Sequence, residues 1–113
     1  ISTSNPSAPG MLKSHYAPRK PLLVGKIPNL LMKKKEAKIG ILSFYQTYSH
    51  PSIKRQIILS PQCSLTEAAR HFFDALRQLD AQEVDYILAE WFPEEGLGRA
   101  LNDKLRRASV QEG

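Results

Sequence analysis

The chain has 113 residues, a hydrophobic content of 42% and a formal net charge of +5. These values allow one small domain with its own core plus some unpacked sequence, and they argue against disorder throughout. The first ten residues contain no apolar run and no initial Met, so we expect neither a secretory signal nor a membrane span, but a piece of a longer polypeptide. The single cysteine, Cys63, excludes an internal disulfide and favours a reducing, cytoplasmic location.

The charge is unevenly distributed along the chain. Residues 1–60 hold ten Lys or Arg against one acid, a balance of +9, whereas residues 61–113 hold six basic and ten acidic residues, a balance of −4. Two interpretations stay open. The basic half could meet a polyanion such as nucleic acid, or its lysines could form an ordinary solvated helix face, which we favour. These lysines are Lys33, Lys34, Lys35 and Lys38.

Proline and serine dominate the start of the chain. Pro6, Pro9 and Pro18, interspersed with serines, are typical of an extended and semi-rigid linker. From Pro21 onward, apolar runs alternate with helical patterns, which indicates a domain boundary. We therefore predict a linker over residues 1–20, a domain over residues 21–109 and a tail over residues 110–113.

The first half of the domain reads as strand, helix, strand, strand. The apolar run at 21–25 predicts a buried strand, and Pro28 is suited to the first turn of a short helix through the lysines. Two further strands are expected at 38–44 and 56–59, joined by a polar connection over residues 45–53. That connection is short for a parallel crossover, so either it contains a tight helical turn or one strand runs antiparallel.

The second half reads as helix, strand, helix. Ser64 and Glu67 have capping-box spacing, and apolar residues recur at intervals of three and four up to Leu79. A strand is expected at 85–92, followed by a helix from Leu97 to Ala108. Because the strands are continuously apolar, the sheet should be covered on both faces. The sequence therefore predicts a small three-layer, Rossmann-like α/β domain with a mostly parallel sheet, preceded by the extended linker.

Neither glycine-rich turn matches a phosphate-binding motif. The segment from Gly25 to Pro28 is neither a dinucleotide fingerprint nor a P-loop. Gly96-Leu97-Gly98 follows two glutamates that would repel a phosphate, and we interpret it as a tight turn with close helix packing. No catalytic constellation and no metal-ligand spacing is visible, so we expect neither catalysis nor a metal site in this chain.

The carboxyl ends of parallel strands are the usual ligand site of such a sheet. Here they predict a candidate strand-edge pocket at Tyr45, Ser60, Glu90 and Trp91. Glu90 ends an otherwise apolar strand, so its carboxylate should either reach solvent or pair with a cation, and we favour structural pairing.

Two parts of the chain carry a family resemblance. Residues 8–19 read APGMLKSHYAPR, a Pro-Gly-Met, three-residue, His-Tyr-x-Pro pattern. The segments LSP (59–61), EAARHFFDALRQLD (67–80) and PEEGLGRAL (93–101) follow in order. Together they resemble the interdomain linker and C-terminal domain of long-form threonylcarbamoyl-AMP synthases.

The resemblance implies an accessory domain of an enzyme that makes threonylcarbamoyl-AMP from L-threonine, bicarbonate and ATP, for the threonylcarbamoyladenosine modification of tRNA. In that family a covalently linked YrdC-like domain binds the substrates, so ATP with magnesium is expected there and no cofactor on this fragment, which should be inactive alone. In that family the linker also crosses the catalytic cavity. The resemblance assigns ligand contacts to Lys13, His15 and Tyr16, and the shape of the crossing to Pro9, Gly10, Met11 and Pro18.

Two alternatives from other functional classes remain. The chain could be a tRNA- or RNA-binding module, as the basic half suggests. It could also be a small-molecule-sensing Rossmann-like domain, with its ligand near Glu90 and Trp91.

Overall fold

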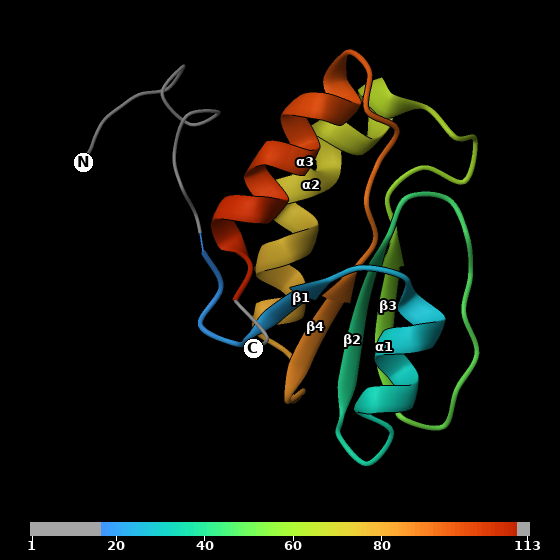
Figure 1. The fold of residues 1–113 in the computed structure, drawn as a ribbon, viewed down its shortest axis with the longest axis vertical. Helices are drawn as coiled ribbons and strands as arrows, with labels where there is room; N and C mark the ends of the chain where they lie inside the picture. Colours follow the sequence, from blue (N-terminus) through green and yellow to red (C-terminus); the bar gives the residue numbers. More distant parts are fainter. Residues whose placement is uncertain (1–16, 111–113) are drawn as a thin grey trace.

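The computed structural model describes residues 17–110 of the chain. Figure 1 shows a sheet with helices on both sides. In chain order the elements are β1 (Leu22–Val24), α1 (Ile27–Lys33), β2 (Ile39–Ser43), β3 (Ile53–Ile58), α2 (Leu65–Asp80), β4 (Tyr86–Ala89) and α3 (Leu97–Ala108). None of these helices is long and apolar enough to cross a membrane.

The four strands form one sheet in the order β1-β4-β2-β3, and every neighbouring pair is parallel. In the centre of the sheet, Leu88 of β4 lies between Leu23 of β1 and Ile41 of β2. The prediction of a mostly parallel sheet is therefore confirmed, and within the described residues the sheet is wholly parallel.

The connection between β2 and β3 joins two parallel strands without a helix, which differs from both expectations. Both expected alternatives, a helical turn and an antiparallel strand, are wrong. The chain runs back along the sheet without a helix and ends in a turn, where the Ile53 N–H donates to the His50 carbonyl oxygen at 3.0 Å. An extended chain advances about 3.3 Å per residue. Residues 44–52 are thus long enough to return along a five-residue strand.

Helices cover both faces of the sheet, as predicted (Figure 1). α2 and α3 lie side by side on one face, over the larger hydrophobic cluster, which includes Phe72, Leu76 and Leu105. α1 lies on the opposite face, over a smaller cluster that includes Leu30 and Ile41. The three-layer α/β prediction is confirmed.

Two strand boundaries differ by more than one residue from those expected. β3 begins at Ile53 rather than Gln56, because the exposed Lys54 and Arg55 belong to an edge strand, where charged side chains are common and the apolar pattern is interrupted. β4 ends at Ala89 rather than Phe92. Beyond Ala89 the backbone of Phe92 bonds to α3 instead of to a neighbouring strand.

Asn102 makes that bond from the middle of α3. The residue is only 1% exposed, and its Oδ1 accepts from the Phe92 N–H at 2.8 Å. Its Nδ2 donates to the Phe92 carbonyl oxygen at 2.9 Å and to Glu94 at 2.8 Å. One buried amide thus satisfies both backbone groups of a residue that has left the sheet.

The turn between β4 and α3 depends on two glycines. Gly96 has φ 53° and ψ −127°, and the Gly98 N–H donates to the Glu95 carbonyl oxygen at 2.9 Å, which defines a type II′ turn. Gly98 lies so close to the preceding segment that a Cβ there would be 1.9 Å from the Pro93 carbonyl oxygen. The interpretation of this segment as a tight turn with close helix packing is confirmed.

Candidate functional site

Most of the linker residues that the resemblance assigns lie outside the described residues. These are Pro9, Gly10, Met11, Lys13, His15 and Tyr16. Pro18 is described and is partly buried. Two parts of the candidate site can therefore be described, namely the end of the linker from residue 17 onward and the carboxyl edge of the sheet.

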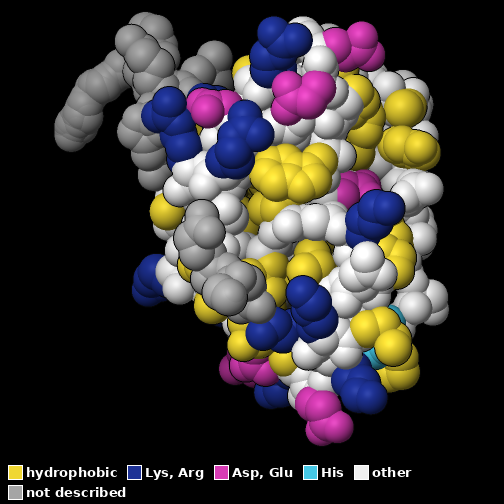
Figure 2. Space-filling model, in the orientation of Figure 1, with side chains coloured by type: hydrophobic (Ala, Val, Ile, Leu, Met, Phe, Trp, Pro, Cys, Tyr) yellow, Lys and Arg dark blue, Asp and Glu magenta, His cyan; other side chains and the backbone are white. Residues whose placement is uncertain are grey.

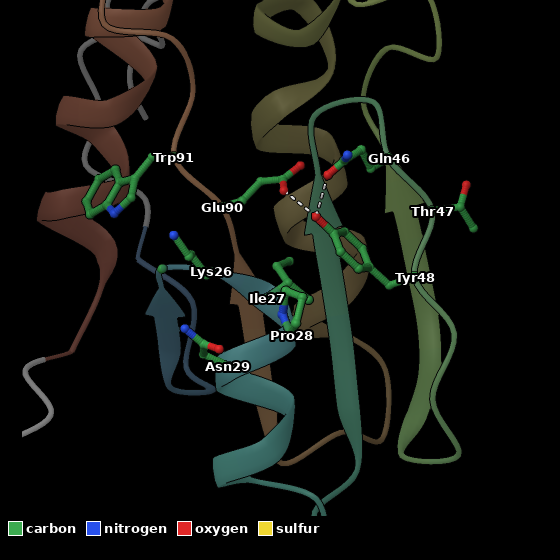
Figure 3. A pocket seen from close by; sticks show the side chains of 10 residues that line it. Lys26, Ile27, Pro28, Asn29, Gln46, Thr47, Tyr48, Glu90 and Trp91 are labelled. Atoms are coloured by element: carbon green, nitrogen blue, oxygen red, sulfur yellow. Dashed lines mark hydrogen bonds between the residues drawn. The ribbon is translucent and has the colours of Figure 1, made fainter.

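The carboxyl edge of the sheet contains a hollow where the connections diverge. β1 and β4 are neighbours, but β1 leads to α1 on one face and β4 leads to α3 on the other. Such a switch point is where ligands bind in open parallel sheets. The hollow has a volume of about 750 Å³. It is lined by Gly25, Lys26, Ile27, Pro28, Asn29, Gln46, Thr47, Tyr48, Glu90 and Trp91 (Figure 3).

Of the four residues predicted for this edge, two line the hollow and two do not. Glu90 and Trp91 line it, and Trp91 is 45% exposed. Tyr45 is exposed and packs its ring edge-on against Phe44, with the centroids 5.4 Å apart. Ser60 is fully buried beneath the start of α2.

Ser60 has a structural task that explains its burial. The Ser64 side chain caps α2 by accepting from the Glu67 N–H at 3.1 Å, as the capping-box spacing predicted. The reciprocal contact is indirect. The Ser64 N–H donates to the Ser60 Oγ at 2.8 Å, and the Ser60 hydroxyl donates to the Glu67 Oε1 at 2.6 Å. Ser60 therefore bridges the two halves of the capping box and points away from the hollow.

The Glu90 carboxylate is held by two uncharged donors. Its Oε2 accepts from the Phe44 N–H at 2.8 Å. Its Oε1 accepts from the Tyr48 hydroxyl at 2.6 Å, and Figure 3 shows this second bond. The Tyr48 oxygen also lies 2.9 Å from the Gln46 side-chain amide. The carboxylate is thus bound within the structure, but not by the expected cation: its partners are a phenol and a backbone amide.

Tyr48 was missed as a member of the edge because it belongs to the β2–β3 connection. It is held in place by Gln56 of β3, whose Oε1 accepts from the Tyr48 N–H at 3.0 Å and whose Nε2 donates to the Tyr48 carbonyl oxygen at 2.7 Å. A glutamine side chain thus substitutes for a strand partner. No local sequence pattern predicts such a contact between residues that are eight positions apart.

Burial of the Tyr48 hydroxyl, together with its hydrogen bond to Glu90 and the charge of that carboxylate, raises the pKa of Tyr48 above its ordinary value. Since the unfolded chain ionises near pH 10, it releases the phenolic proton first, and folding stability should fall as the pH rises above about 10. We expect this fall to be steeper for the wild type than for Tyr48→Phe, by less than about 1.4 kcal/mol per pH unit because the ring is partly exposed to solvent. Urea unfolding of both proteins at several alkaline pH values measures the difference. Parallel curves would contradict the assignment.

The lining of the hollow contains no paired nucleophile and base, and within residues 17–110 no group of three or more His, Cys, Asp or Glu could hold a metal ion. Cys63 is exposed, in the turn before α2. What the hollow offers is an exposed indole, one lysine and several amide and hydroxyl groups, which suits binding rather than covalent chemistry.

The fold and the hollow define the class of protein, a Rossmann-like α/β domain that carries no catalytic constellation in its described part. The comparisons are more specific. The family model "Threonylcarbamoyl-AMP synthase, C-terminal domain" matches residues 2–110. The chain belongs to this family.

Curated relatives named threonylcarbamoyl-AMP synthase agree. The chain is 32% identical over 114 residues to the Bacillus subtilis (strain 168) protein, covering 92% of the chain and 32% of that protein. It is 35% identical over 119 residues to the Pyrococcus abyssi protein, covering 96% of the chain and 33% of that protein. The chain thus spans about a third of the length of these relatives.

Solved structures show the same fold. The crystal structure of P. abyssi Sua5 complexed with L-threonine matches with a TM-score of 0.72 and 35% identity, over 83% of this chain and 29% of that one. The C-terminal Sua5 domain from Pyrococcus horikoshii matches with a TM-score of 0.60 and 30% identity, over 80% of this chain and 93% of that one. A further P. abyssi Sua5 structure, with a TM-score of 0.68 and 34% identity over 81% of this chain and 28% of that one, has a His and the Tyr after it replaced by alanine.

Proposed function

We propose that this chain is the accessory domain and active-site-covering linker of an enzyme that makes threonylcarbamoyl-AMP from L-threonine, bicarbonate and ATP, for threonylcarbamoyladenosine in tRNA. The observation that carries the proposal is the family match over residues 2–110, combined with relatives about three times as long as the chain. The extra length of those relatives leaves room for a covalently linked YrdC-like catalytic domain.

In this proposal the catalytic domain binds ATP and magnesium, and this chain is inactive by itself. We retain residues 1–20 as linker, 21–109 as domain and 110–113 as tail, and we expect the parent enzyme to work in the cytoplasm, in keeping with the single cysteine.

The linker is the part that we propose meets the reactants. Threonylcarbamoyl-AMP is a labile mixed anhydride, so a segment that closes over it and excludes water protects it. His15 and Tyr16 can donate hydrogen bonds to phosphate oxygens, and Lys13 adds a positive charge. The P. abyssi Sua5 variant, in which a His and the Tyr after it are replaced by alanine, supports this choice because it alters the same two residue types in the same order.

The test uses the full-length enzyme. We expect His15→Ala and Tyr16→Phe each to lower ATP- and threonine-dependent pyrophosphate release by roughly tenfold to a hundredfold, because one hydrogen bond to a charged group is worth about 1.5–3 kcal/mol. His71→Ala is the matched control, since His71 is exposed on α2, and it should change nothing. Unchanged kinetics in both linker variants would refute the covering role.

Two alternatives have weaker support. For nucleic acid, Lys34 lies over the Tyr86 ring at 4.6 Å, and the lysines at the end of α1 share their surface with Glu36 and Asp85. Figure 2 shows basic side chains scattered among acidic and apolar ones on the visible face rather than gathered into one surface. For a sensed small molecule, the hollow beside Glu90 and Trp91 is the candidate site, and its binding groups point to no particular ligand.

A further inference from the structure

The carboxylate of Asp80 binds the backbone at the end of the linker. Asp80 is the last residue of α2 and is only 6% exposed. Its Oδ2 accepts from the Arg19 N–H at 3.1 Å, and its Oδ1 accepts from the Lys20 N–H at 3.0 Å. The Lys20 ammonium donates to the Asp80 carbonyl oxygen. One residue therefore binds two successive backbone amides of a segment about 60 positions away.

The position of this carboxylate is unfavourable for the helix that carries it. The C-terminus of a helix bears partial negative charge and favours cations, and burying a carboxylate is costly unless it accepts hydrogen bonds. The buried oxygens of Asp80 accept hydrogen bonds from the backbone of residues 19–20, which lowers the cost of burying the carboxylate.

The residues that follow also bond to the domain. The contact between Asp80 and residues 19–20, called the anchor below, is therefore the first of several such contacts along the chain. The Pro21 carbonyl oxygen accepts from the Ile87 N–H at 2.9 Å, and the Leu22 carbonyl oxygen accepts from the Val110 N–H at 3.0 Å. These contacts tie the chain to β4 and to the residue after the end of α3. Among the hydrogen bonds described for residues 17–110, those from Arg19 and Lys20 to Asp80 lie nearest to residue 16.

We propose that Asp80 is a positioning residue that sets the reach of the linker over the active site, an inference that rests on the covering role proposed above. Tyr16 is three residues before Arg19 and five before Pro21. Covalent geometry limits these distances to about 10 Å and about 17 Å. If the anchor moves from Arg19 to Pro21, the volume accessible to Tyr16 grows about twofold for a flexible chain and about fivefold for an extended one, and its local concentration at the ligand falls in proportion.

The experiment compares Asp80→Ala and the milder Asp80→Asn with Asp74→Ala, which removes an exposed carboxylate from the same helix. In the full-length enzyme, kcat/KM for pyrophosphate release should fall by roughly twofold to fivefold for Asp80→Ala and less for Asp80→Asn, which keeps one acceptor. Hydrogen exchange at the Arg19 and Lys20 amides should accelerate in both. Asp74→Ala should change neither measurement.

The same Asp80 substitution in a linker variant distinguishes a positioning role from a general effect on stability. In enzyme that already carries His15→Ala and Tyr16→Phe, Asp80→Asn should cause no further loss of kcat/KM, because there is no linker contact left to position. An equal loss in that background would overturn the inference, as would full activity of Asp80→Ala and Asp80→Asn while the linker variants are slow. If the linker variants themselves retain full activity, the covering role is refuted and the positioning role with it.

Discussion

Replacement of Gly98 by alanine is expected to lower the free energy of unfolding of this domain by about 3 kcal/mol or more. A Cβ on Gly98 would lie 1.9 Å from the Pro93 carbonyl oxygen and 3.0 Å from its carbon, both of which are backbone atoms. The collision cannot be relieved by a side-chain rotation. Either α3 moves away, or the Pro93 carbonyl turns and breaks its hydrogen bond with the Glu95 N–H, which is 2.9 Å long. Urea unfolding of the chain measures the loss.

Gly25→Ala is the matched control for this prediction. A Cβ on Gly25 would meet the Leu30 side chain at 3.7 Å, which is ordinary van der Waals contact. We expect a change in stability of no more than about 1 kcal/mol, of either sign. If the two alanine variants are equally stable, the close approach of α3 to Pro93 is refuted, and with it the reason for a glycine at this turn.

The fold could be predicted because its main signals are local. Apolar runs of strand length, the 3.6-residue period of α2, the Ser64–Glu67 spacing and the Gly-Leu-Gly turn each report on neighbouring residues. Consistent local signals specify the layers even when individual boundaries shift. The β2–β3 connection was mispredicted because nothing local encodes it. It depends on Gln56 pairing with the backbone of Tyr48, a contact known only once the two segments lie side by side.

The site was less predictable for the same reason. Sequence reasoning found Glu90 and Trp91, because they end a strand whose direction could be inferred. It placed Ser60 at the same edge, although Ser60 turns to the start of α2, and it missed Asp80, whose partners are the amides of residues 19–20. A carboxylate at the end of a helix reads as a surface residue. Its partners are backbone amides, which every residue except proline has, so the identity of residues 19 and 20 does not reveal the contact.

Substitution of Asn102 is the second large effect that we expect. In Asn102→Leu the volume is nearly kept, but the Phe92 N–H and carbonyl oxygen lose their partners in the interior. Each of these two unsatisfied buried backbone groups costs about 1–3 kcal/mol, so stability should fall by about 2–6 kcal/mol. Asn102→Asp keeps the acceptor for the Phe92 N–H and removes both donors, and it places a carboxylate beside Glu94, so it should be no milder at neutral pH.

The control is Asn29→Ala, which removes an exposed amide from the first turn of α1 and should stay within about 0.5 kcal/mol of the wild type. Urea unfolding, followed by the fluorescence of the neighbouring Trp91, measures all three variants. Since Asn102 holds the segment that joins the hollow to α3, Asn102→Leu should also alter the environment of Trp91 in the native state. Native stability and fluorescence equal to those of the wild type would mean that the Phe92 backbone does not depend on Asn102.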